Sequence, residues 1–350
     1  MTHHGADIAG LPGIATPPAD VPEMQRGEWL PLTLDDEMVR YLTAFFWPGG
    51  TGSPAWHVAR LSSAAHVYQE QATGWAIVAK YHGVKTGEDA GRHAQREWDA
   101  VAEAHAAGLA GGDVRALRAH GLWRGTILLE YVEGLTLHDS IAVRRSQPGM
   151  LVPRLQATAR LLATLHGGGA HPDVPAGFQP AVSYAHRVID NLSRWGVLQD
   201  QPHVVDALRT LVGRWAERRE MSGFNSVLLH GDATTTNFVF PSAGGVVGVD
   251  WERASIGDPA ADLGRLMAEV AHSIAQLGGG ASEAEPFLGR LAEAYRHALA
   301  PGIDAEALLH RARFYRATST LRVARNGWLS RQVRLALVAE GMALLVQQNT

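Results

Sequence analysis

A short run of polar residues in the last third of the chain carries the side chains best suited to chemistry. His230-Gly231-Asp232 leads through Ala233 and three threonines to Asn237, and Asp250 follows after a further apolar stretch. The two carboxylates and the amide oxygen are hard ligands, of the kind that Mg²⁺ binds together with water and phosphate oxygens. An aspartate in such a site can also accept the proton of a hydroxyl group. These residue types therefore indicate metal-assisted chemistry at a phosphate.

The elements around this run explain how the side chains can meet. Apolar residues 227–229 lead into the polar loop, residues 238–240 leave it, and residues 246–249 deliver Asp250 after a turn at 241–245. The pattern predicts a strand–loop–strand–turn–strand unit with its polar side chains at strand ends. The oxygen atoms of Asp232, Asn237 and Asp250 can then converge on one point. The alternative is a β-hairpin with a solvated polar loop.

The spacing is also that of a phosphotransfer catalytic loop, in which an Asp takes the hydroxyl proton and an Asn and a second Asp hold metal. Three motifs make the similarity specific. They are His-Gly-Asp-x-x-x-x-Asn, Asp250-Trp-Glu-Arg, and Gly257-Asp-Pro-x-x-Asp262-Leu. Together they resemble the aminoglycoside phosphotransferase and choline kinase family, which has a protein-kinase-like fold. One such motif alone would carry little weight, but all three occur in order.

The resemblance implies a role for each of these residues. Asp232 would be the catalytic base, and Asn237 and Asp250 would hold Mg²⁺ that bridges the phosphates of ATP. Asp262 would brace the catalytic loop. Within the second motif, Glu252 could touch a second metal, and Arg253 could equally form a structural ion pair.

A lysine and a glutamate in the first half of the chain match the same pattern. Only Lys80 and Lys85 are lysines among 31 basic residues. Lys80 ends the apolar stretch Ala-Ile-Val-Ala-Lys, so a compact ammonium is favoured there over a guanidinium. The resemblance implies that Lys80 binds phosphate and pairs with Glu97, on a helix predicted over 88–105. The alternative for Glu97 is an ordinary solvated charge on the helix. The alternative for a retained lysine is chance, which is how we interpret Lys85 in its loop.

The remaining nucleotide contacts follow from the resemblance alone. The turn between the first two strands would cover the phosphates, and Ser62 and Ser63 stand there in place of glycines. Glu130, Tyr131 and Val132 would form the hinge whose backbone reads the purine edge. Because backbone groups read it, either ATP or GTP is compatible with this hinge.

The predicted architecture is α+β, a two-lobed protein-kinase-like fold with a small antiparallel sheet and a larger helical lobe. Strands are expected at 56–61, 67–71, 75–81, 114–123 and 126–132, which makes a five-stranded sheet. Residues 1–55 are expected to be an extension with a short helix over 38–46, capped by Thr33 or Asp35 and ended at 48–50. Residues 56–132 form the nucleotide-binding lobe and 133–350 the helical lobe, with the catalytic loop and acceptor site.

Composition narrows the class of function. The chain has 350 residues, a formal net charge of −4 and no cysteine. This charge does not support nucleic-acid or anionic-membrane binding, and no secretory signal or long apolar run is visible. The absence of cysteine fits a reducing compartment, and we expect a cytoplasmic protein. The oligomeric state cannot be read from the sequence.

The expected function is an ATP- or GTP-dependent kinase that phosphorylates a hydroxyl of a small-molecule metabolite or antibiotic-like acceptor. The alternative is an inactive nucleotide-binding pseudokinase or scaffold, although Lys80, Asp232, Asn237 and Asp250 are all present. A metal-dependent hydrolase would leave Lys80 and the hinge unexplained. A protein kinase is disfavoured because His-Gly-Asp replaces His-Arg-Asp and no Ala-Pro-Glu follows.

The acceptor should bind the helical lobe, where arginines exceed acids. Residues 280–350 hold nine Arg and six Asp or Glu, and five of the arginines cluster at 311, 313, 316, 322 and 325. A polycationic acceptor would call for a surplus of carboxylates. We therefore expect a neutral or anionic hydroxylated acceptor. A solvated, arginine-rich helix face is the alternative explanation.

Overall fold

The computed structural model describes residues 28–33, 35–47, 54–82, 89–169, 171, 174, 177–194 and 196–346. Predictions made for residues 1–27, for the helix stop at 48–50 and for Lys85 lie outside the described residues. The chain divides into two compact units, each described here by itself. Unit 1 holds the chain up to Ala102 together with Leu117–Val132, and unit 2 holds Glu103–Ala116 and Glu133 onward.

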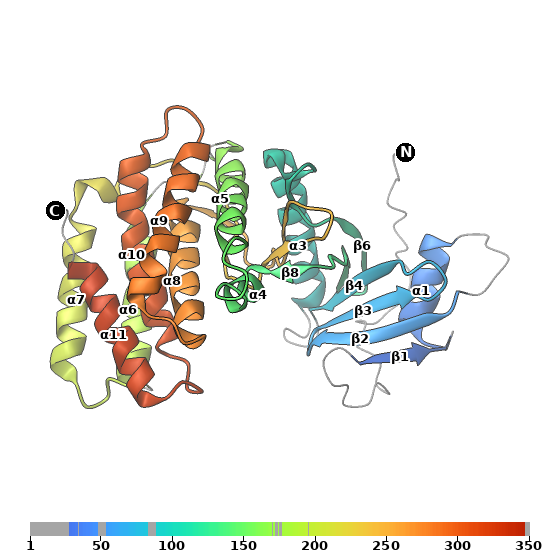
Figure 1. The fold of residues 1–350 in the computed structure, drawn as a ribbon, viewed down its shortest axis with the longest axis horizontal. Coiled ribbons are helices and arrows are strands. Elements are labelled where there is room, and N and C mark those ends of the chain that lie inside the picture. Colours follow the sequence, from blue (N-terminus) through green and yellow to red (C-terminus); the bar gives the residue numbers. More distant parts are fainter. Residues whose placement is uncertain are drawn as a thin grey trace. The chain divides into compact units, whose positions relative to one another are not determined.

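Unit 1 is built on an antiparallel sheet of six strands (Figure 1). In spatial order they are β1 (Trp29–Leu32), β2 (Trp56–Ser62), β3 (Ala65–Glu70), β4 (Ala76–Tyr81), β7 (Thr126–Glu130) and β6 (Ala119–Trp123). The expected five-stranded sheet is therefore wrong by one strand. The sixth is β1, which pairs with β2 from Trp29 opposite Ala59 to Leu32 opposite Trp56. Its partner lies beyond a helix in the chain, so local pattern could not reveal the pairing.

The stretch predicted as one strand at 114–123 is two strands in different sheets. Val114–Ala116 forms β5, which pairs in parallel with β11 of unit 2, whereas Ala119–Trp123 forms β6 of unit 1. The apolar run is continuous in sequence, but its two halves bond to different partners. Strand identity here is fixed by the partner and not by local composition.

The core of unit 1 lies between the sheet and helix α1 (Glu37–Phe46), with Met38, Val39 and Leu42 buried against the strands. Asp36 caps the helix by accepting the Val39 N–H at 2.9 Å, so the predicted caps Thr33 and Asp35 are wrong. Along β4 every second residue is buried. Since side chains alternate across a strand, Lys80 points to the face opposite the buried Ile77, Ala79 and Tyr81.

Unit 1 also contains most of helix α3 (Ala90–Ala104), which continues as a π-helical turn at His105–Leu109 in unit 2. The remaining helices of unit 2 are α4 (Leu137–Ala142), α5 (Leu151–Gly167), α6 (Gln179–Arg194), α7 (Pro202–Ala216), a 3₁₀ turn (Arg219–Met221), α8 (Ala260–Gln276), α9 (Ala281–Ala298), α10 (Ala305–Val323) and α11 (Arg331–Val346). In Figure 1, α5, α8, α9 and α10 stand side by side.

Helices α8 and α10 approach each other closely in unit 2. Gly264 of α8 permits this, because a Cβ there would collide with the Ala312 carbonyl and the Tyr315 side chain of α10. Helix α10 is buried on nearly all sides, since α11 covers its other flank. Its buried residues include Arg311 and Arg316, and buried charges of this kind require partners.

Two small sheets complete unit 2 and deliver the polar loop. Strands β5, β11 (Val246–Gly248), β10 (Phe238–Phe240) and β8 (Leu135–Thr136) form one sheet in that order, and β12 (Ser255–Gly257) pairs with β9 (Val227–Leu229) in the other. The predicted strand–loop–strand–turn–strand unit is confirmed as β9, β10 and β11.

No helix in the described part of the chain is long and apolar enough to cross a membrane.

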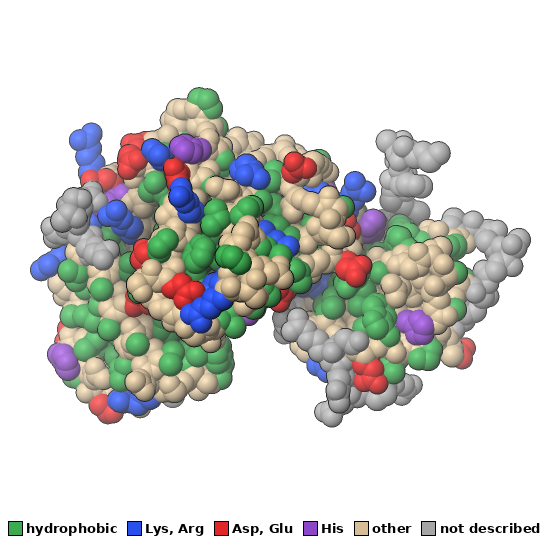
Figure 2. Space-filling view, in the orientation of Figure 1, with side chains coloured by type: hydrophobic (Ala, Val, Ile, Leu, Met, Phe, Trp, Pro, Cys, Tyr) green, Lys and Arg blue, Asp and Glu red, His purple; other side chains and the backbone are tan. Residues whose placement is uncertain are grey.

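Basic and acidic side chains are interspersed on the face shown in Figure 2.

A cluster of ion pairs joins the chain just after α4 to the start of α9. Arg144 donates to one carboxylate oxygen of Glu283 at 2.6 Å and Arg145 to the other at 2.7 Å. Hydrogen bonds from Arg144 and Arg145 lower the pKa of Glu283 to about 2.

We expect the Glu283→Gln variant to lose a pH-dependent contribution to stability. The depressed pKa means that the folded state favours the ionised carboxylate, so the contribution is present above the ordinary pKa of 4.5 and is lost as the pH falls toward about 2. In urea unfolding, the gap in free energy between wild type and variant should be widest near neutral pH and should close on acidification. Glu293→Gln, in an exposed pair with Arg290, is the control. A gap that stays constant with pH would contradict the assignment.

Candidate functional site

One pocket of unit 2, about 450 Å³ in volume, is lined by Asp232, Asn237 and Asp250 together. Asp232 follows β9, Asn237 precedes β10, and Asp250 follows β11, so each stands at the end of a strand. The structure thus brings the three predicted residues together in the lining of one pocket.

The loop that carries Asp232 is tightly folded against the chain that follows Asp250. Gly231 has φ +74°, and a Cβ there would collide with the carbonyl oxygen of Arg253. Only glycine combines this left-handed backbone with such close approach. Within the loop, the Asp232 carbonyl accepts the Thr234 N–H at 2.7 Å. These contacts fix the direction in which the Asp232 side chain leaves the loop.

Asp262, near the start of α8, holds the backbone of this loop through hydrogen bonds. One carboxylate oxygen accepts the backbone N–H of His230 at 2.6 Å, and the other accepts that of Gly231 at 3.0 Å. His166 contacts the first oxygen through Nε2 at 3.2 Å and contacts the Tyr295 hydroxyl at 2.6 Å through Nδ1. Burial alone would raise the pKa of Asp262, but its hydrogen bonds and the two histidines lower it instead. Asp262 therefore braces this loop, as the resemblance implied, and His166 is a packed structural residue that supports it.

His230 is buried and is not among the residues that line this pocket. Its ring is fully buried and packs against Trp251 and Phe238, with centroids 4.6 and 5.6 Å away. Burial lowers the pKa of His230, so the ring is neutral at pH 7. The side chain fills space beneath the loop.

Asp232 is held by an arginine that the sequence analysis did not single out. Arg265 of α8 donates from Nη1 to Asp232 Oδ1 at 2.7 Å and to the Gly231 carbonyl at 2.6 Å. The other oxygen, Oδ2, lies 3.9 Å from Nε of Arg253. One carboxylate oxygen is thus fixed by a guanidinium. Oδ2 is the atom better placed to take a proton from a molecule in the pocket.

Helical spacing would have identified Arg265. Residues 262, 265, 269, 272 and 276 recur every three or four positions and share one face of a helix. Once Asp262 is assigned to the loop, Arg265 must face the same loop. Further along the stripe, Glu269, His272 and Gln276 line the pocket that contains Asp232.

Asn237 and Asp250 offer oxygen ligands suited to Mg²⁺. The amide nitrogen of Asn237 donates to the Asp232 carbonyl at 2.9 Å, which fixes the side-chain oxygen as the atom available to a ligand. Asp250 has φ +65°, a left-handed conformation that Asp tolerates better than most residues. One carboxylate and one amide oxygen beside a shared pocket fit a hard divalent cation that keeps several waters.

In unit 1, Lys80 and Glu97 form the predicted pair. Lys80 Nζ lies 3.0 Å from Glu97 Oε1, and His82 Nε2 lies 3.0 Å from the other oxygen. Glu97 is fully buried, which excludes the solvated-charge alternative. A buried carboxylate with two partners holds the lysine ammonium at a defined place on the sheet.

The remaining predicted nucleotide contacts also lie in unit 1. Ser62 ends β2 and Ser63 stands in a tight turn to β3, where the Ser62 hydroxyl accepts the Ala64 N–H at 3.2 Å. Glu130 ends β7, and its carboxylate accepts the Arg118 N–H at 3.0 Å. Tyr131 and Val132 follow β7. Tyr131 is partly buried and packs against the core of unit 1.

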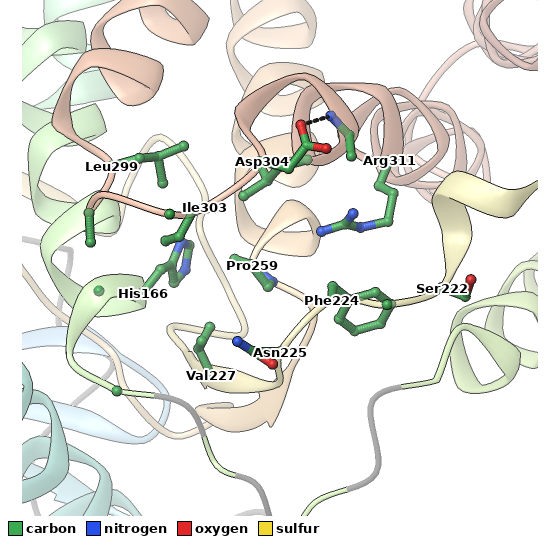
Figure 3. Close-up of a pocket in the computed structure, with 17 residues that line it drawn as sticks. His166, Ser222, Phe224, Asn225, Val227, Pro259, Leu299, Ile303, Asp304 and Arg311 are labelled. Atoms are coloured by element: carbon green, nitrogen blue, oxygen red, sulfur yellow. Dashed lines mark hydrogen bonds between the residues drawn. The ribbon is translucent and has the colours of Figure 1, made fainter.

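The C-terminal arginines do not gather around Asp232. Arg311 forms a buried two-bond pair with Asp258, at 2.9 and 3.2 Å, and lines a different pocket of about 410 Å³ with His166 and Phe224 (Figure 3). Arg316 bonds Glu285 at 2.6 Å. Of the five clustered arginines, Arg322 lines the Asp232 pocket, where it bonds Glu269. The charge of Arg311 therefore has a structural partner, as the alternative explanation of this cluster allowed.

Comparison with known sequences identifies one family. The family described as the phosphotransferase enzyme family (APH) matches residues 60–315, which is most of the chain. No curated protein matches the sequence.

Solved structures show the same fold. The ethanolamine kinase of Plasmodium vivax has a TM-score of 0.57 at 13% identity, with 86% of each chain covered. A choline/ethanolamine kinase family protein from Mesorhizobium loti has a TM-score of 0.52 at 19% identity, covering 90% of this chain and 96% of that one. The streptomycin–ATP–APH(2'')-IIa complex has a TM-score of 0.53 at 12% identity, covering 91% and 97%. The predicted α+β, protein-kinase-like fold is confirmed.

We expect Asp262→Ala to destabilise the protein strongly. The change leaves two buried backbone N–H groups and His166 without their acceptor, and each such loss costs about 1–3 kcal/mol. The free energy of unfolding in urea should fall by at least about 3 kcal/mol. Asp190→Ala removes an exposed pair with Arg209 and should cost less than about 1 kcal/mol. Equal effects of the two changes would show that Asp262 does not brace the loop.

Proposed function

The chain belongs to the phosphotransferase enzyme family, and we propose that it is a Mg²⁺-dependent kinase that transfers the γ-phosphate of ATP to a hydroxyl of a small molecule. The observation that carries this proposal is the pocket shared by Asp232, Asn237 and Asp250, with Asp232 oriented by Arg265. The printed names of similar structures support small acceptors, since they include ethanolamine kinase and a complex with streptomycin and ATP. GTP is a second possible donor, because the proposed hinge reads the purine through its backbone.

The proposed mechanism assigns the proton to Asp232. Its Oδ2 accepts the proton of the acceptor hydroxyl while the hydroxyl oxygen bonds to the γ-phosphorus. The bond from that phosphorus to the β–γ bridging oxygen breaks, and ADP leaves. Arg265 keeps Oδ1 engaged, so that Oδ2 is presented to the hydroxyl. Orientation of this kind is where most of the protein's contribution to phosphoryl transfer lies.

Asn237 and Asp250 would hold Mg²⁺ through their side-chain oxygens. The metal supplies charge compensation for the phosphates. Asp250 lies on a short strand connection, and Asn237 is fixed by its own bond to the Asp232 carbonyl. The proton acceptor and a metal ligand are thus held in one loop.

For the nucleotide, we propose contacts from the sheet-containing part of the chain. Lys80, held by Glu97, would neutralise phosphate charge, and Ser62 and Ser63 would lie over the phosphates. Glu130, Tyr131 and Val132 would form the hinge. Residues 56–132 would then bind the nucleotide and residues 133–350 the acceptor, with residues 1–55 contributing the edge strand β1 and helix α1.

A thermal-shift titration tests nucleotide and metal binding together. Mg-ATP at about 100 times its dissociation constant should stabilise the folded protein by roughly 2.7 kcal/mol. Asp250→Asn keeps the shape and tolerates the left-handed backbone but removes the charge, so the Mg²⁺-dependent part of the shift should disappear. Asp206→Asn, with a side chain 75% exposed, is the control and should behave as wild type. No shift with either Mg-ATP or Mg-GTP would contradict the proposed kinase and would indicate a degenerate kinase-like protein that does not bind these nucleotides.

Replacing Arg265 tests the orientation of Asp232. Arg265→Met should lower kcat for ADP formation about 10- to 100-fold, with water as the acceptor in the first instance, while KM for ATP stays unchanged. Added guanidinium ion should restore part of the rate, which a merely structural loss would not allow. Arg290→Met, in an exposed pair, provides the control. An unchanged kcat would rule out a positioning role for Arg265.

A further inference from the structure

The charge of the pocket around Asp232 is balanced. Apart from Asp232 and Asp250, the lining described by the structure contains one carboxylate, Glu269. That carboxylate is largely buried and bonds Arg322, so its charge is already compensated. Burial raises the pKa of Glu269, while Arg322 and Arg265 act in the opposite direction. Besides Asp232 and Asp250, a polycation would therefore meet one acidic side chain in this lining, and that one is paired with Arg322.

A guanidinium group in the lining also disfavours a cationic acceptor. Arg253 borders the pocket, whereas the charge of Arg322 is already paired with Glu269. Arg253 lies 3.9 Å from Asp232 and the same distance from Glu252, so its charge remains near the position of the reacting hydroxyl. An ammonium group bound there would be repelled at close range.

Neutral polar groups make up most of the remaining wall. The hydroxyl of Ser273 lies 3.2 Å from that of Thr235 and 3.3 Å from His138 Nδ1. Burial, together with Arg322 and His138, lowers the pKa of His272, so its ring is uncharged at pH 7 and can both donate and accept. A wall of hydroxyl, imidazole and amide groups suits an acceptor with several hydroxyls.

Trp328 borders the same pocket and is an unusual surface residue. Its side chain is 70% exposed, the highest value among the large hydrophobic residues that the structure describes as exposed. It is the one aromatic residue besides histidine among the described lining residues. A cage for a quaternary ammonium normally needs several aromatic faces. A single indole face instead suits stacking against one flat, partly apolar ring.

We propose that the acceptor is a neutral polyhydroxylated ring, of the sugar or cyclitol class, which stacks on Trp328 and bonds the polar wall formed by Ser273 and His272. This inference rests on the proposed function, because it names the molecule that receives the phosphate. The stacked ring would direct one hydroxyl toward Asp232 while its other hydroxyls bond the wall.

The test separates binding from transfer. Calorimetry without nucleotide measures binding of hexoses and inositols, of the polycations kanamycin and neomycin, and of choline. A coupled assay with Mg-ATP then measures ADP formation with the same compounds. We expect a neutral ring to bind and to raise ADP formation at least tenfold over water, with no response to polycations or choline. A neutral ring that binds without ADP formation supports the acceptor class and counts against the kinase proposal.

The Trp328 variants test the stacking. Trp328→Ala should raise KM for the ring about tenfold, as expected when one stacking face is lost. Trp328→Phe should recover part of this loss, and the thermal shift with Mg-ATP should not change. Val333→Ala, which trims an exposed side chain outside the pocket, is the matched control. Phosphorylation of a polycation or choline, or no response to any neutral ring, would overturn the inference and leave the nucleotide shift as the independent test of the kinase.

Discussion

The hydrogen bonds that Asp262 makes to the backbone of His230 and Gly231 are the constraint on which the site depends. A loop of polar residues between two three-residue strands has little packing of its own, so an external anchor must fix it. The anchor is a buried carboxylate, and buried carboxylates are stable only when fully bonded. His166 also contacts this carboxylate and is itself bonded to Tyr295, which ties the loop to helices α5 and α9 as well as α8.

Helix α8 extends this constraint into the chemistry. Its first turn holds the loop through Asp262, its second turn orients Asp232 through Arg265, and its later turns line the pocket through Glu269 and His272. One helical face therefore supports the backbone, directs the proposed base and shapes the space for the acceptor. A rigid helix fixes such a row of side chains more accurately than a loop could.

The sequence predicted the parts of the site in which local pattern and chemistry coincide. Asp232, Asn237 and Asp250 stand at strand ends, where the pattern of strands and turns placed them. The pair of Lys80 with Glu97 was implied by the family resemblance. The failures share a different cause. Strand β1, the split between β5 and β6, and the partner of Arg311 are all set by residues far away in the chain. Whether an arginine faces a ligand or a buried aspartate depends on tertiary contacts, which composition does not record.

The close contact at Gly264 limits how helices α8 and α10 can move relative to each other. Helices α8 and α10 meet there without an intervening side chain, so neither can slide or tilt without a backbone clash. Arg265 extends from the first helix to the proposed base, and Arg322, near the end of the second, borders the same pocket as Trp328. The proposed base is thus oriented from one of two closely packed helices, and a residue that lines its pocket extends from the other. Selection and reactivity are then expected to change together during evolution, because a mutation that shifts either helix moves both.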